Sequence, residues 1–187
     1  MDGSHARNSH AYDPLERYTR DSIVGLTAAK VIDRYAEDIG GGQRDAIFRG
    51  TGVCSMSIPR YLVRIFKWSK CSIATAIVML ASLYRLLELP NGVTFVPLTA
   101  HRLVAATFIL AVKFTDESVL STDEYAKIFG MNKQEVVLLE MHTFRMLDYS
   151  LMVTREQYIQ LANYCLDLTN EWQIPLQQTH SDQNKLQ

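Results

Sequence analysis

The sequence predicts an all-α protein, and three observations support this prediction. Apolar residues recur at helical spacing in successive segments of the chain. These segments are separated by short links that contain glycine, proline or polar residues. No stretch alternates apolar and polar residues convincingly, as a half-buried strand would require. Helices that follow one another through short links are typical of a bundle, and 187 residues are enough for one domain with a sizeable core.

The N-terminal part of the chain is expected to contain one marginal helix. Residues 1–21 are polar and are predicted to be disordered. Residues 22–39 show helical spacing, and glycines 40–42 end this helix because three glycines cost too much backbone entropy. With the loop that follows, residues 22–52 are predicted to form an N-terminal helix and a glycine-rich loop.

The next two helices are each expected to begin after a serine. Ser57 is predicted to cap a helix that runs to about Trp68 and has Pro59 in its first turn, where a missing N–H is harmless. Ser72 is predicted to cap a helix over 73–89. Because this second helix is apolar nearly all round, it is expected to lie in the core.

Two capping-box spacings predict the helices of the C-terminal half. Ser121 and Asn132 each stand three residues before a glutamate, and Gly130 lies between them as a stop. This pattern predicts a short helix at 122–129 and a long one at 133–147.

A third long apolar helix is expected from Thr99 to about Phe114, and a last helix from 154 to about 170. The chain is accordingly divided into the N-terminal parts described above, a main domain at 53–151, a C-terminal helix at 152–172 and a flexible tail at 173–187.

Composition excludes several classes of function. A net charge of −1 gives no electrostatic reason to expect a nucleic acid or an anionic membrane as partner. The longest apolar run, 103–112, is much shorter than the roughly 20 residues of a membrane helix. The odd cysteine count, Cys54, Cys71 and Cys165, fits free thiols in small core residues and a reducing compartment. We therefore expect an intracellular protein of the nucleus, the cytoplasm or both.

No pattern of catalytic residues points to an enzyme. The nine glycines form no phosphate-binding loop, and the five histidines and three cysteines show no zinc-ligand spacing. The motifs of a protein kinase are absent as well. We expect no catalytic activity, no metal and no cofactor.

Two charges stand out because each lies within an apolar helical stripe. Lys113 ends the third long helix, and Glu140 lies in the helix at 133–147, with apolar residues one turn away in both cases. An ion in such a place is costly unless it has a partner. The two side chains can pair with each other, extend to the surface, or lie at a rim where they bind a partner's backbone groups.

Two stretches of the sequence carry a resemblance to a known family. SIPRYLVRIFKWSKCS (57–72) and LTAHRLVAATFILAVKF (98–114) resemble the single-box Pho80-type (P/U-type) cyclins, which are regulatory subunits of cyclin-dependent kinases. The resemblance covers about residues 50–150 in the order of its segments. It implies a five-helix cyclin box with flanking N- and C-terminal helices.

The resemblance also assigns roles to individual residues. Lys113, in the motif A-x-K-F, and Glu140, in L-E-x-x-x-F, match the residues with which cyclins grip a helix of the kinase. The same motifs add Phe114, Leu139 and Phe144 to the expected kinase-binding residues. The alternative is an ion pair that only fixes the packing of two helices.

An arginine of the first box helix belongs to the family's usual constellation, in which it meets an aspartate of the second helix. Arg64 is the better match for this arginine and Arg60 the other candidate. Tyr84 stands where the aspartate is expected, so the usual ion pair cannot form, although a phenol oxygen can accept one hydrogen bond. We include Arg64 among the kinase-binding residues; the alternative for both arginines is a solvated helix charge.

Two further stretches bear on the resemblance to the family. Asp116 and Glu117 match the acidic end of a turn, but a solvated loop is the favoured interpretation. The stretch PRYLVRIFKW lacks the docking patch of many cyclins, so no such substrate site is inferred, and Phe66 and Trp68 are at least as compatible with a core position.

The resemblance implies a regulatory subunit that binds and activates a cyclin-dependent protein kinase, in cell-cycle or nutrient (phosphate) signalling. One alternative is a cyclin-fold protein-interaction module that activates no kinase. Another is a nucleic-acid-associated factor of the TFIIB type, against which the net charge and the single box argue.

Overall fold

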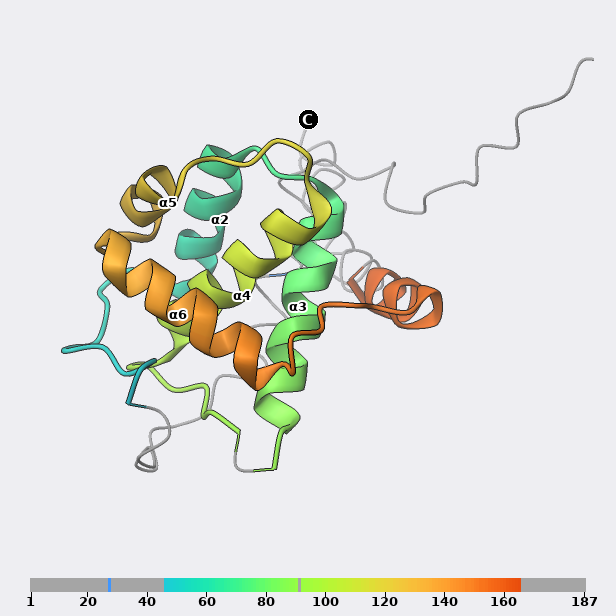
Figure 1. The fold of residues 1–187 in the computed structure, drawn as a ribbon, viewed down its shortest axis with the longest axis horizontal. Coiled ribbons are helices and arrows are strands. Elements are labelled where there is room, and N and C mark those ends of the chain that lie inside the picture. The colour runs from blue at the N-terminus through green and yellow to red at the C-terminus, as the bar shows by residue number, and fades with distance from the viewer. Residues whose placement is uncertain (1–26, 28–45, 91, 166–187) are drawn as a thin grey trace, which may run out of the picture.

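Helix α4 (Ala100–Thr115) is the centre of the molecule because its sequence is apolar on every side. Ala100 and all residues from Leu103 to Val112 are buried. In the computed structural model, α4 packs against α3 (Ile73–Glu88), α6 (Lys133–Met146) and α2 (Ile58–Ser69), as Figure 1 shows. A helix surrounded in this way fixes the positions of the others.

The structure describes residues 27, 46–90 and 92–165, and within these residues it contains helices and no strand. The short helix α5 (Thr122–Phe129) packs against α2 and α6, and a further helical segment spans 155–165. The prediction of an all-α fold is confirmed, and the ends of α2 to α6 agree with the sequence-based bounds to within about one residue.

Several predicted segments lie outside the described residues. These are the disordered segment 1–21, most of the helix expected at 22–39, the last part of the helix expected at 154–170 and the tail at 173–187. Of the expected N-terminal helix the structure describes Thr27 alone, which is helical and fully buried. The division of the chain into parts therefore stays a prediction.

Most of the predicted caps are present. The Ser121 hydroxyl accepts the backbone N–H of Glu124, and the Glu124 carboxylate accepts the N–H of Ser121 at 2.8 Å, which completes a capping box. Gly130 ends α5 in the left-handed conformation, with φ 72°. The side chains of Ser72 and Asn132 cap α3 and α6.

Two predictions about single residues near α2 are corrected. The side chain of Ser57 makes no capping bond; its backbone carbonyl accepts the N–H of Tyr61 instead. Cys54 is exposed in the loop before α2, whereas the other two cysteines are buried as expected. The two aromatic residues of α2 differ in burial. Phe66 is buried, whereas Trp68 lies outside the apolar stripe of α2 and is 63% exposed.

Candidate functional site

Lys113 and Glu140 form a direct ion pair between the end of α4 and the middle of α6. Lys113 Nζ donates to both oxygens of the Glu140 carboxylate, at 2.7 and 2.8 Å. The side chains are 37% and 20% exposed, so the pair lies at the rim of the core and in contact with solvent. Of the three arrangements open to these charges, the structure shows mutual pairing at the surface.

Exposed or half-buried apolar side chains lie next to the two members of this pair along α4 and α6. Phe114 follows the lysine and is 49% exposed, and Met141 follows the glutamate and is 59% exposed. Val137 and Phe144 lie one turn before and one turn after Glu140, so they share its face of α6. We call the set formed by Lys113, Phe114, Val137, Glu140, Met141 and Phe144 the α4–α6 surface.

The chemistry of the α4–α6 surface suits the backbone of a partner helix. An ammonium group has three donors, and a carboxylate has about four acceptor positions. The mutual pair leaves part of this capacity free, so Lys113 can donate to a partner's carbonyl oxygen while Glu140 accepts from a partner's N–H. The exposed apolar residues beside the pair offer area for burial on binding.

Two of the residues predicted for kinase binding lie elsewhere. Leu139 is 2% exposed and belongs to the core, where it holds α6 against the bundle. Arg64 donates from Nη2 to the backbone oxygen of Lys127 at 2.9 Å and so joins α2 to the last turn of α5. Tyr84 is half-buried and packs against the core.

Asp116 has a structural role that differs from the expected solvated loop. Its Oδ2 accepts the backbone N–H of Ser72 at 2.9 Å, and its Oδ1 accepts from the hydroxyl of Thr75 at 3.2 Å. The carboxylate therefore binds the N-terminal end of α3, where the helix dipole favours a negative charge. Glu117, by contrast, is exposed as expected.

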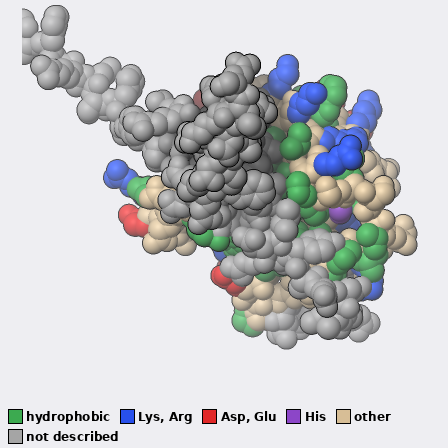
Figure 2. Space-filling view, turned by 180° about the vertical axis from the view of Figure 1, so that it is seen from behind, with side chains coloured by type: hydrophobic (Ala, Val, Ile, Leu, Met, Phe, Trp, Pro, Cys, Tyr) green, Lys and Arg blue, Asp and Glu red, His purple; other side chains and the backbone are tan. Residues whose placement is uncertain are grey.

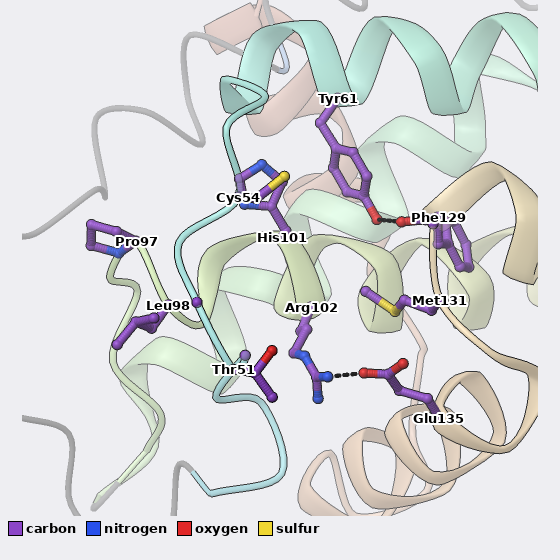
Figure 3. Close-up of a pocket in the computed structure, with 13 residues that line it drawn as sticks. Thr51, Cys54, Tyr61, Pro97, Leu98, His101, Arg102, Phe129, Met131 and Glu135 are labelled. Carbon is purple, nitrogen blue, oxygen red and sulfur yellow. Dashed lines mark hydrogen bonds and ion pairs between the residues drawn. The ribbon is translucent and has the colours of Figure 1, made fainter.

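A pocket of about 280 Å³ lies between the loop before α2, the start of α4 and the link from α5 to α6. Arg102 and Glu135 form an ion pair across it (Figure 3). Arg102 also donates to the backbone oxygen of Ile47 at 3.0 Å. The sequence gives no signal for this ion pair, because Arg102 and Glu135 each stand before an apolar run rather than inside one.

Tyr61 and His101 form the upper wall of the pocket (Figure 3). The Tyr61 hydroxyl donates to the backbone oxygen of Phe129 at 3.1 Å, and burial raises the pKa of this phenol. His101 packs edge-on against Tyr61, and its Nε2 lies 2.7 Å from the backbone oxygen of Met56. Burial lowers the pKa of His101, and its Nδ1 is buried without a hydrogen-bond partner.

Residues 27, 46–90 and 92–165 contain no group of three or more His, Cys, Asp or Glu side chains that could hold a metal ion. In the same residues no helix combines the length and the apolar character needed to cross a membrane.

Comparison with known proteins agrees with this architecture. The family model described as "Cyclin" matches residues 6–151. This match covers most of the chain and includes all the helices from α2 to α6. The chain belongs to the cyclin family, and its all-α fold is that of the cyclin box.

The relatives define the type of cyclin. The chain is 34% identical to Cyclin-P3-1 of Oryza sativa subsp. japonica over 139 residues, which cover 72% of this chain and 57% of the relative. It is 30% identical to Cyclin-U1-1 of Arabidopsis thaliana over 135 residues, 72% of this chain and 63% of the relative. Cyclin-U4-3 of Arabidopsis thaliana is 28% identical over 165 residues, 88% of this chain and 74% of the relative.

These similarities support a cyclin of the P/U type, as the sequence predicts. The chain spans less than two thirds of the length of the first two of these relatives.

Proposed function

We propose that this chain is a regulatory subunit that binds and activates a cyclin-dependent protein kinase through the α4–α6 surface. The observation that carries the proposal is the Lys113–Glu140 pair, a two-bond ion pair at the surface with exposed apolar residues beside it. Membership of the cyclin family supports a kinase as the partner.

In this proposal the chain performs no chemistry of its own. The α4–α6 surface binds a movable helix of the kinase, with apolar contacts around hydrogen bonds from the ion pair. Such binding would hold the kinase's ATP-positioning Lys–Glu pair and its activation segment in the working geometry. A role in cell-cycle or nutrient signalling, in the nucleus or cytoplasm, is part of the same proposal.

The test is recovery of the kinase with the full chain from the source cells. The double variant Lys113→Ala with Glu140→Ala removes the ion pair of the α4–α6 surface and is expected to abolish co-purification of a kinase. A matched control is Lys133→Ala with Asp123→Ala, which removes another ion pair, also joined at 2.7 Å, between α6 and α5. Unchanged recovery with the first variant would contradict the proposal.

A second measurement separates activation from binding alone. The purified kinase is assayed on a generic peptide with and without the wild-type chain. A rise in kcat is expected on addition of the chain. A complex that forms without any rise would indicate an interaction module rather than an activating subunit.

A further inference from the structure

Helix α2 is basic along its whole length although the chain as a whole carries a net charge of −1. Its charged residues are Arg60, Arg64 and Lys67, and no Asp or Glu occurs anywhere from residue 46 to residue 87. Positive charge is therefore concentrated in this part of the protein, without acidic residues among it. A local excess of one sign attracts groups of the other sign whatever the net charge of the chain.

The basic residues share the solvent-facing side of α2. The buried stripe of the helix consists of Ile58, Tyr61, Leu62, Ile65 and Phe66. On the opposite side, helical spacing brings together the residues that we call the outer face of α2: Arg60, Val63, Arg64, Lys67 and Trp68. Figure 2, seen from behind the view of Figure 1, shows Lys and Arg side chains gathered in the upper right with apolar side chains among them.

No carboxylate of the described residues forms a salt bridge with these cations. The salt bridges within the described parts of the chain join Arg102, Lys113 and Lys133 to acidic residues. The bond from Arg64 goes to a backbone carbonyl, which leaves its positive charge uncompensated. Lys67 lies over the ring of Trp68, 5.8 Å from its centroid, and this contact also leaves the charge in place.

The apolar members of the outer face indicate the kind of partner. Trp68 is 63% exposed and Val63 is 51% exposed. Tryptophan and arginine together are the residues most enriched at the energetic centres of protein interfaces. A bilayer would need a broad apolar stripe on the helix, but that stripe of α2 is already used by the core. Three cations around an exposed indole therefore suit an acidic peptide segment better than a membrane.

We propose that the outer face of α2 is a docking site for an acidic segment of a partner protein, with an apolar side chain of that segment seated against Trp68. Carboxylates of the segment pair with Arg60 and Lys67. The residues of this site lie on α2, whereas those of the α4–α6 surface lie on α4 and α6. The proposal does not depend on a kinase being the partner of the chain.

The test selects peptides on the full chain and then measures them in solution. A display library of random peptides is enriched on the immobilised protein, and the selected peptides are labelled with fluorescein for polarisation measurements. They are expected to be rich in Asp and Glu, with at least one large apolar residue. Their affinity should fall with rising salt, since exposed charges are screened.

Variants of the outer face decide whether these peptides use it. Arg60→Gln with Lys67→Gln is expected to weaken binding about tenfold at low salt, and Trp68→Ala by about tenfold or more. The matched control, Lys133→Gln with Arg155→Gln, removes the same charge from exposed positions outside α2 and should change affinity less than about twofold. Circular dichroism checks that each variant remains folded.

The tryptophan content of the chain allows a direct readout. The chain has two tryptophans, so Trp172→Phe leaves Trp68 as the only one. An acidic peptide seated on the outer face should shift the emission of Trp68 to shorter wavelength. Selected peptides that are not acidic, or that bind the Arg60→Gln/Lys67→Gln variant as tightly as wild type, overturn the proposal. So does α2-dependent binding that is confined to phosphatidylserine vesicles or a DNA duplex.

Discussion

Exchanging the two charges of the Lys113–Glu140 pair separates a partner-binding role from a packing role. The variant Lys113→Glu with Glu140→Lys keeps one cation and one anion at the same two positions. It reverses which position offers donors and which offers acceptors to a partner. The wild-type arrangement, at 2.7 and 2.8 Å, defines the starting geometry.

The structure sets the size of the effect on stability. At about 2.7 Å the gross Coulomb energy of two unit charges is about 1.5 kcal/mol in bulk water and about 6 kcal/mol at an effective dielectric constant near 20. Lys113 is 37% exposed, so solvent screening and the entropy of two long side chains leave a net contribution of about 0.2–1 kcal/mol. Removing the pair with two alanines should therefore lower the melting temperature by no more than about 4 °C.

The effect on kinase binding is expected to be much larger. Truncating a charged group that is desolvated and bonded in an interface costs about 2–5 kcal/mol, which corresponds to a loss of affinity of about 30-fold or more. The exchanged variant should lose affinity to the same extent. Its unfolding free energy should stay within about 1 kcal/mol of wild type, with a small loss because Glu is disfavoured at the C-terminal end of α4.

Two measurements check this reasoning. Urea denaturation gives the unfolding free energy of the full chain, and isothermal titration gives its affinity for the purified kinase. The control exchanges Lys133 and Asp123, whose side chains are 54% and 58% exposed. If the Lys113→Glu/Glu140→Lys variant binds the kinase with wild-type affinity, the pair only fixes helix packing and the proposed function loses its main support.

Three further predictions concern the scaffold. Gly92→Ala should destabilise the protein by more than about 1 kcal/mol in urea denaturation, because the added Cβ would lie 2.4 Å from a backbone oxygen, whereas Gly52→Ala, with nothing within 4 Å, should be nearly neutral. Burial lowers the pKa of His101 below its ordinary 6.5, so the folded protein takes up this proton less readily than the unfolded chain. The contribution of neutral His101 to the free energy of unfolding should therefore be fully present above about pH 6.5 and decrease as the pH falls below it. His101→Gln should make the loss of unfolding free energy between about pH 7 and about pH 5 smaller in urea titrations. An unchanged loss would contradict the assignment of this pH dependence to His101. Asp116→Ala should cost about 1 kcal/mol of unfolding free energy by freeing the N–H of Ser72, with a smaller cost for Asp116→Asn, which keeps an acceptor.

Sequence patterns predicted most of the fold because the signals for it are local. Helical periodicity, a serine three residues before a glutamate and a glycine stop are read within a single turn or two of chain, as the capping box at Ser121 and the left-handed Gly130 show. The apolar character of α4 on every side likewise predicted its central position. The same signals failed at Ser57, where the residue type fits a cap but its side chain makes no capping bond.

Contacts between distant segments could not be predicted from such local signals. Nothing in the sequence shows that Asp116 closes the start of α3, or that Arg102 meets Glu135 across a pocket. Nor does the sequence show that Arg64 donates to a backbone carbonyl of α5. Backbone partners leave no mark on the identity of a residue, so sequence patterns do not reveal them.

The sequence by itself was enough to predict the all-α class, to show the resemblance to a cyclin and to identify Lys113 and Glu140 as charges within apolar helices. It left open three arrangements for Lys113 and Glu140, because a helical stripe gives the direction of a side chain but not its distance from another helix. The packing of α6 on α4 decided among them and placed the pair in mutual contact at the surface. Only the tertiary structure also showed that Leu139 is buried while Met141, two residues further on, is exposed, because burial depends on which face of a helix its neighbours cover.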